Sequence, residues 1–390
     1  MKEVSNMKIK VLIINFSILV FFLLAPAVAL TFYKSVKKTF ENPANKIFYL
    51  SDHLEKDEVK NILAMLNNPV TYQYKSFTSW EPKQINNDLM KIQGKYNTRK
   101  SLNENLNNSN WFFGGSTIFG IGAVDNETIP SNYASITSEE VMNFGREDWA
   151  SRQSLNQLVN LIGDGLQPKR IIFYDGVNDI SHQCSNLTKN EKIPFHNRET
   201  IFRDYINKGE SDFLSSLKVS SQNFFKRFRT YIISPYKHLI IKLYRSGIVK
   251  KNPYKLTEEL QCANNPIRAN LVAKHLVNNW FVAYQIAKSK NVSFLAILQP
   301  NMFTSNSSIF IDPYFERFSY LKPSFDAVYP EIRKEMRNSC NYDLDFCKSL
   351  IDGSQWLKGK EEELLDFCHL TGRGNIIISE KLNQVILKNK

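Results

Sequence analysis

Four short runs of this chain are almost entirely apolar instead of alternating between apolar and polar residues. They cover residues 111–113, 141–144, 170–174 and 292–298. A strand with this pattern is buried on both faces, which occurs mainly in parallel sheets that helices cover on both sides. Apolar residues at helical spacing follow in residues 155–162 and 376–387. The sequence therefore predicts an α/β fold with three layers and a mainly parallel sheet.

Polar side chains that can perform acyl transfer follow some of these runs. Ser116 comes after the first run and two glycines, and Asn178 comes after the third run and Gly176. Open α/β folds bind ligands at the carboxyl edge of the sheet, where such turns lie. Asp366 and His369, three residues apart, stand near the other end of the chain. A serine can attack an ester, a histidine can take the serine proton, and a carboxylate can orient the imidazole.

Each of these residues also has a purely structural interpretation. Ser116 can be a plain turn serine, and Asn178 can simply complete a turn. Asp366 can begin a helix as its N-cap, with His369 on the surface nearby. Asp-X-X-His recurs by chance in many chains. The functional interpretation therefore depends on the occurrence of all the blocks together, in order.

Together, these blocks resemble the SGNH (GDSL-like) hydrolase family over about residues 111–387. The matching positions are Gly114-Gly115-Ser116 with Gly120, Asn143-Phe144-Gly145, Gly176-Val177-Asn178-Asp179 and Asp366-Phe367-Cys368-His369. The resemblance implies a three-layer flavodoxin-like fold with a mainly parallel five-stranded sheet. It also implies a catalytic triad of Ser116, Asp366 and His369, with no cofactor and no metal.

The resemblance further implies a set of oxyanion donors. Two of them are the backbone N–H of Ser116 and the side chain of Asn178. The family takes a third from a glycine about five residues after the asparagine of its second block, and that position holds Asp148 in this chain. Gly145 is the other candidate for this donor. A carboxylate at position 148 adds negative potential near a developing oxyanion.

The amino terminus predicts export. Residues 11–33 carry no charge and follow three lysines, and about 20 apolar residues span a bilayer core. We expect residues 1–38 to form a signal anchor, so that the catalytic domain lies outside the cytoplasm, in the periplasm or the extracellular space. The alternative is a cleaved secretory signal ending near Ala27-Val28-Ala29. Residues 39–105 are predicted as a stalk and irregular lead-in, and residues 106–390 as the hydrolase-like domain.

Cysteine content agrees with an exported protein, in which disulfides can persist. A bridge between Cys184 and Cys262 would close a long loop, and one between Cys340 and Cys347 a short loop. Cys368, beside His369, would remain unpaired. The alternative is five free thiols. The chain has no Cys-X-X-Cys pair, which disfavours a zinc ribbon.

A basic segment interrupts the α/β pattern. We expect a helical insertion at about residues 182–270, and residues 217–255 contain ten Lys or Arg but no Asp or Glu, with aromatic residues interleaved. One interpretation is an insert packed on the domain with a solvated basic face. The other is a surface that contacts anionic lipid or an acidic polymer. The net charge of +12 favours anionic partners, but an exported chain seldom meets nucleic acid.

These features predict a membrane-anchored serine esterase that hydrolyses an O-acyl ester through an acyl-Ser116 intermediate. We expect an O-acetyl group on an extracytoplasmic glycan, or a small ester, because of the compartment and the family resemblance. The same site could instead transfer the acyl group to another hydroxyl, as an O-acyltransferase, or act on lipid esters. A different class of function is a non-catalytic glycan-binding scaffold. The carboxylate of Asp148 makes it plausible, because negative potential near an oxyanion disfavours catalysis.

Overall fold

The computed structural model describes residues 56–67, 70–184, 261–304 and 318–388, together with Asn15 and Leu54. Apart from Asn15, all of them belong to one of two compact units, which consists of residues 47–203 and 258–390. The predicted anchor apart from Asn15, the basic residues 217–255 and most of the predicted insertion lie outside the described residues. No helix within the described ranges combines the length and apolar character that crossing a membrane requires.

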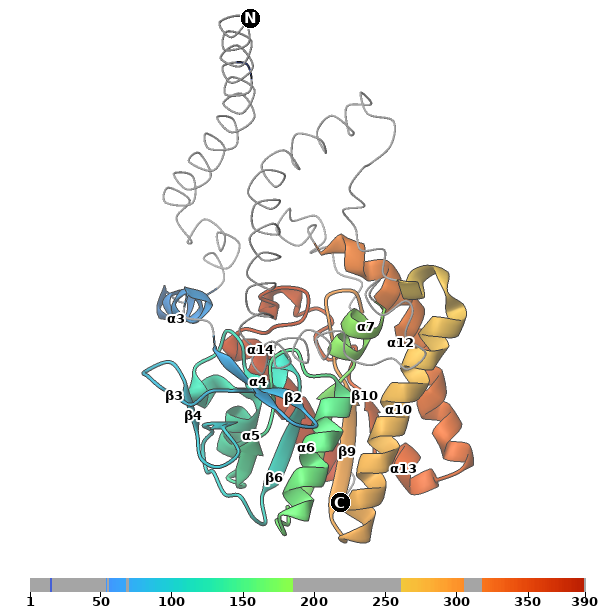
Figure 1. The fold of residues 1–390 in the computed structure, drawn as a ribbon, viewed down its shortest axis with the longest axis horizontal. Coiled ribbons are helices and arrows are strands. Elements are labelled where there is room, and N and C mark those ends of the chain that lie inside the picture. The colour runs from blue at the N-terminus through green and yellow to red at the C-terminus, as the bar shows by residue number, and fades with distance from the viewer. Residues whose placement is uncertain are drawn as a thin grey trace, which may run out of the picture. The chain divides into compact units, whose positions relative to one another are not determined.

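Five neighbouring parallel strands, which begin at one edge, make up most of an eight-stranded sheet (Figure 1). They are β6 (Asn110–Gly114), β7 (Val141–Asn143), β8 (Arg170–Asp175), β9 (Ser293–Leu298) and β10 (Leu350–Asp352). Their order across the sheet is β10-β9-β8-β6-β7. Numbered along the chain, this is the 2-1-3-4-5 order of flavodoxin-like folds, whose ligand site lies where the winding reverses, between the first and third strands. The predicted α/β fold with a mainly parallel sheet is therefore confirmed.

Residues before the predicted domain boundary at 106 extend this sheet. Three short antiparallel strands, β5 (Thr98–Arg99), β4 (Lys91–Gln93) and β3 (Ile85–Asn86), continue it beyond β7. A separate hairpin consists of β1 (Tyr72–Lys75) and β2 (Ser79–Pro82). Much of the expected irregular lead-in is thus structured, and the domain begins earlier than residue 106. These strands are only two to four residues long, which is too short for an alternating pattern to show in the sequence.

Helices pack in two groups. One consists of α6 (Ser151–Gly163), α10 (Pro266–Ser289) and α12 (Lys322–Asn338), in which α10 contacts both neighbours. In the other, α5 (Ile129–Thr137) contacts α14 (Gly372–Lys388). Right-handed crossovers place helices on opposite faces when the winding direction reverses at β6. The remaining α-helices are α3 (Lys56–Asn67), α4 (Ser116–Phe119), α7 (Val177–Gln183) and α13 (Leu344–Lys348). Short 3-10 helices cover Asp125–Glu127, Gln261–Asn264, Ser319–Leu321, Ser339–Asn341 and Glu361–Glu363.

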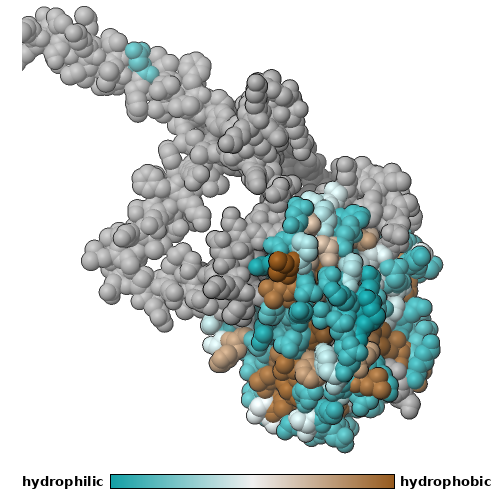
Figure 2. Space-filling view, turned by 90° about the vertical axis from the view of Figure 1, so that its right-hand side faces the viewer, coloured by the Kyte–Doolittle hydropathy of each residue, from teal (hydrophilic) through white to brown (hydrophobic). Residues whose placement is uncertain are grey.

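The core lies on both faces of the central strands. Trp111, Phe112 and Phe113 of β6 are each 0% exposed, as a strand with helices on both sides requires. Figure 2 shows the side on which α10, α12 and α13 lie in Figure 1. Hydrophilic residues dominate this face, and hydrophobic residues form separate patches between them.

Two disulfides form with the expected pairing. Cys184, just after α7, is bonded to Cys262, and Cys340 is bonded to Cys347. Cys368 is free and buried. The first bridge therefore joins the end of α7 to the start of the next described range, at residue 261.

Candidate active site

Ser116 is positioned by the turn that joins β6 to α4. Strand β6 ends at Gly114, and Ser116 is the first residue of α4. A side-chain carbon at Gly115 would collide with Nδ2 of Asn178 and would lie 3.3 Å from the carbonyl oxygen of Trp149. Glycine leaves room here for the side chain of Asn178 on α7 and for the backbone of Trp149, which both approach the turn closely. The serine lies at the carboxyl end of the central strand, beside the point where the winding reverses.

The structure brings the three predicted triad residues together. Nε2 of His369 lies 2.7 Å from Oγ of Ser116, and Nδ1 of His369 lies 2.6 Å from Oδ2 of Asp366. The side chains of His369 and Asp366 are 17% and 21% exposed, so solvent and a substrate can reach the edge of the cluster. Serine hydroxyl, imidazole and carboxylate form a continuous chain in the order that acyl transfer requires.

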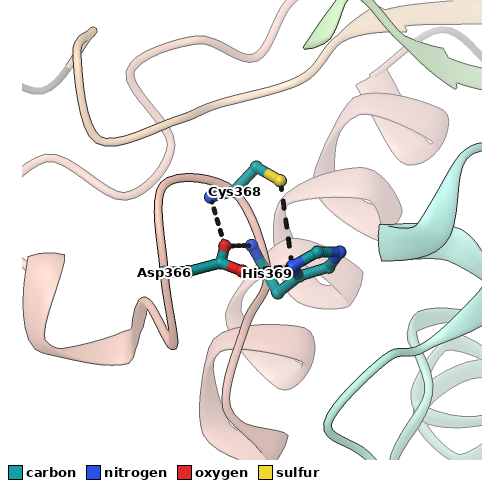
Figure 3. Close-up of side chains that lie close together, drawn as sticks. All are labelled: Asp366, Cys368 and His369. Atoms are coloured by element: carbon teal, nitrogen blue, oxygen red, sulfur yellow. Dashed lines mark hydrogen bonds and ion pairs between the residues drawn. The ribbon is translucent and has the colours of Figure 1, made fainter. Parts of the chain in front are cut away.

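Asp366 is fixed by the backbone of its own loop. Its Oδ1 accepts hydrogen bonds from the backbone N–H groups of Cys368 and His369, each at 2.8 Å (Figure 3). Its other oxygen remains directed at the imidazole. The loop closes on itself, because the N–H of Leu365 donates to the carbonyl of His369 at 2.8 Å. The same hydrogen-bonded loop therefore holds both the base and the carboxylate.

The charges of this loop stabilise the imidazolium that forms when His369 takes the serine proton. Burial favours the neutral form of Asp366, but His369 and the two backbone donors outweigh it and hold the pKa of Asp366 at about 2. Burial also lowers the pKa of His369, whereas Asp366 and Cys368 raise it, and the result lies well above the ordinary histidine value. Burial raises the pKa of the Cys368 thiol to about 11. A carboxylate thus faces the imidazole and stabilises its protonated form.

The same loop raises the question of a metal site. Among the described residues, Asp366, Cys368 and His369 have ligand atoms within 4.8 Å of one another. Two ligands of a tetrahedral zinc ion, each about 2 Å from it, lie about 3.3 Å apart. Oδ2 of Asp366 and Nδ1 of His369 are closer than that, at 2.6 Å, and share a hydrogen bond. The arrangement fits a proton-transfer chain better than an ion site.

Asn178 is oriented by a neighbouring backbone group. It lies in the first turn of α7, and its Nδ2 donates to the carbonyl of Trp149 at 2.9 Å. A primary amide has two N–H groups, so the second can donate to a substrate oxygen. Nδ2 also adjoins Gly115, the residue before Ser116. The side chain is therefore placed beside the serine, as an oxyanion donor must be.

Gly145 does not supply an oxyanion donor in this structure. Its N–H donates to Oδ1 of Asn143 at 2.9 Å, and Nδ2 of Asn143 donates to the carbonyl of Ile118 at 2.9 Å. A side-chain carbon at Gly145 would collide with the backbone of Phe119. The second sequence block therefore serves packing, because it holds the end of α4 next to β7.

Asp148 occupies a backbone conformation that favours glycine. Its φ is +60°, within a turn in which the N–H of Trp149 donates to the carbonyl of Arg146 at 3.3 Å. Nε2 of His182 on α7 lies 3.0 Å from the carbonyl oxygen of Asp148. Aspartate is among the few non-glycine residues that adopt a left-handed φ readily. Asp148 therefore takes a conformation that glycine would also adopt without strain, and its N–H as an oxyanion donor stays a prediction.

Several contributors to the site carried no recognisable sequence signal. Trp149 acts through its backbone oxygen, which any residue would provide. Asp179 on α7 belongs to the third sequence block, but its partner does not: it accepts a hydrogen bond from Oγ of Ser151 at 2.6 Å, and Asp175 at the end of β8 accepts one from Nε1 of Trp280 at 3.0 Å. Burial raises the pKa of both carboxyl groups. These contacts depend on residues far apart in the chain, which a single sequence does not pair.

Comparison with known proteins gives a limited result. No protein-family model matches the chain, and no curated protein matches it. Among solved structures, it is similar to a protein from Bacteroides fragilis described as an acylhydrolase (12% identity, TM-score 0.37, 74% of this chain and 90% of that one). It is also similar to a GDSL-like lipase from Bacteroides thetaiotaomicron (11%, 0.34, 72% and 88%) and to an acetyl xylan esterase (11%, 0.37, 71% and 99%). Because these TM-scores lie below 0.5, we base the functional proposal on the geometry of the site.

Proposed function

We propose that this protein is a serine hydrolase of the SGNH type that cleaves carboxylic esters. One observation carries the proposal: Ser116, His369 and Asp366 form an unbroken hydrogen-bonded chain with links of 2.7 and 2.6 Å. A plain turn serine and an incidental histidine would not be expected to form a hydrogen bond with each other while a carboxylate accepts from the other imidazole nitrogen. The geometry supports nucleophilic catalysis with His369 as general base.

In the proposed reaction, Oγ of Ser116 attacks the carbonyl carbon of the ester while Nε2 of His369 takes the serine proton. The carbonyl oxygen becomes an oxyanion, which Asn178 and the N–H of Ser116 stabilise. The imidazolium, held by Asp366, then gives its proton to the leaving alkoxide as the carbon–oxygen bond breaks. Water attacks acyl-Ser116 with His369 again as base, which releases the acid and restores the serine.

We further propose a small acyl group, such as O-acetyl, on an extracytoplasmic glycan as the substrate. The support is the family resemblance together with the charge-free residues 11–33, which favour a membrane anchor. Acyl transfer to a second hydroxyl uses the same site. A lipid ester would suit the basic residues 217–255, which could contact anionic headgroups. A product assay with and without an added sugar acceptor separates hydrolysis from transfer.

A fluorophosphonate probe tests the proposed nucleophile. It should label the wild-type protein covalently, and Ser116→Ala should remove the label. The matched control is Ser289→Ala, which changes an exposed serine at the end of α10 and should leave labelling intact. Failure of the folded wild-type protein to react would contradict the esterase proposal and favour a non-catalytic glycan-binding scaffold.

A further inference from the structure

Two buried tryptophans link the β1–β2 hairpin to the loop formed by residues 146–149. Nε1 of Trp80, on β2, donates to the carbonyl of Glu147 at 3.1 Å. In return, Nε1 of Trp149 donates to the carbonyl of Trp80 at 3.1 Å. The two residues are only 2% and 1% exposed. Buried indole N–H groups need acceptors, so each ring is committed to this reciprocal contact.

This contact continues to the proposed oxyanion donor. The carbonyl of Trp149 accepts the hydrogen bond from Nδ2 of Asn178, at 2.9 Å. The same carbonyl lies against Gly115, next to the proposed nucleophile. Hydrogen bonds therefore run from Trp80 through Trp149 to Asn178. The terminal torsion of an asparagine side chain is soft, so the position of its acceptor decides where the amide points.

The start of the loop has anchors of its own. The N–H of Arg146 donates to the carbonyl of Gly114 at 3.0 Å, and Nη2 of Arg146 donates to the carbonyl of Tyr96 at 2.7 Å. These contacts fix residue 146 against β6. Farther along, Trp80 holds Glu147 and Trp149, and His182 contacts the carbonyl of Asp148. The hairpin thus acts on the end of the loop that faces Asn178.

We propose that Trp80 is a positioning residue for Asn178, acting through Trp149, and that the β1–β2 hairpin is therefore part of the active site. The inference rests on the proposed esterase function. Oxyanion stabilisation depends on donors that are already oriented before the reaction, and a displacement of about 1 Å can cost about a hundredfold in rate. Trp80 itself makes no contact with the reacting atoms in this account.

The test compares two tryptophan-to-phenylalanine variants that lose the same kind of bond. Trp80→Phe keeps an aromatic ring but removes the N–H that holds Glu147. Trp111→Phe is the matched control, because Nε1 of Trp111 donates to the carbonyl of Leu106 at 2.9 Å inside the core. Each variant is assayed with 4-nitrophenyl acetate and its thiono analogue, and active enzyme is counted by fluorophosphonate titration. Sulfur is a weak hydrogen-bond acceptor, so the oxo-to-thiono rate ratio reports oxyanion stabilisation.

We expect Trp80→Phe to lower kcat on the oxoester about tenfold, with little change in KM, and to lower the oxo-to-thiono ratio. Trp111→Phe should leave this ratio at the wild-type value, because a merely structural loss affects both substrates alike. Trp149→Phe removes the reciprocal bond and should act like Trp80→Phe, which provides a second test if Trp80→Phe does not fold. An unchanged ratio in the folded variants would overturn the inference. A wild-type protein without ester hydrolysis or labelling would instead overturn the proposed function.

Discussion

Oγ of Ser116 lies 2.7 Å from Nε2 of His369, although 253 positions separate the two residues in the chain. The serine follows the central strand β6, and the histidine lies in the loop that precedes the last helix, α14. The contact between Thr117 and the carbonyl of Cys368, at 3.4 Å, joins the same two segments. The proposed nucleophile and its base are thus brought together by the closure of the whole α/β unit.

Asp366→Asn should change the pH dependence of the reaction. Only neutral His369 can accept the serine proton, so kcat/KM should fall as the pH drops through the pKa of His369. Burial lowers this pKa, but Asp366 and Cys368 raise it above the ordinary value. Removing the Asp366 charge should therefore move the acid limb to lower pH, and kcat on the plateau should fall by about 10⁴-fold.

The measurement is a pH profile of kcat/KM for both proteins. Asp164→Asn serves as the control, because Asp164 is a solvent-facing carboxylate paired with Lys95 at 2.9 Å. It should leave the acid limb where the wild-type protein has it. If the acid limb of the Asp366→Asn profile lay at the same pH as in the wild-type protein, Asp366 would not set the pKa of His369.

Asn178→Ala should lower kcat by about 10²- to 10³-fold, with the fold largely unchanged, because one oriented oxyanion donor is lost. Asn132→Ala is the matched control, since its Nδ2 also donates to a backbone carbonyl, that of Glu127, at 2.9 Å. Steady-state kinetics and thermal unfolding of both variants separate the two effects. Equal kinetic losses in both variants would argue against a role for Asn178 in catalysis.

Asp148→Asn should increase activity. Asparagine tolerates the left-handed φ of +60° at this position, so the backbone of the turn should be preserved. The change removes a negative charge from the loop that precedes Trp149, whose carbonyl holds Asn178, and the expected gain in kcat is on the order of tenfold, or about 1.4 kcal/mol. Ser138→Asn, at φ +57° after α5, controls for general effects of asparagine in this conformation. A loss of activity in Asp148→Asn would mean that the carboxylate itself is needed.

The two disulfides should differ in their contribution to stability. The bonded cysteines are 78 positions apart in the first disulfide and 7 apart in the second. Loop entropy predicts a stabilisation of about 4.5 kcal/mol for the long loop and about 2.4 kcal/mol for the short one. Replacing Cys184 and Cys262 by serine should therefore lower the unfolding free energy more than replacing Cys340 and Cys347. Denaturant unfolding of the two double variants measures the difference. The reverse order would show that the denatured chain keeps the long loop closed without its bond.

The strongest local patterns in the sequence predicted their elements well. The apolar runs became β6, β7, β8 and β9, because burial on both faces leaves a pattern that a single strand displays by itself. By contrast, β10 (Leu350–Asp352) and the short strands of residues 85–99 went unrecognised. A strand of two or three residues carries almost no pattern, and its pairing is decided by the sheet edge that it meets.

The sequence by itself determined the residue types of the proposed triad, the order of the strands along the chain and the glycines that let the β6–α4 turn pass close to its neighbours. Tertiary structure decided the rest. It paired the N–H of Gly145 with Asn143, gave Asp148 a left-handed φ and linked Trp80 through Trp149 to Asn178. The physical reason is that the residue type decides which hydrogen bonds a side chain can make, whereas the packing of distant segments decides which partner lies close enough to make them.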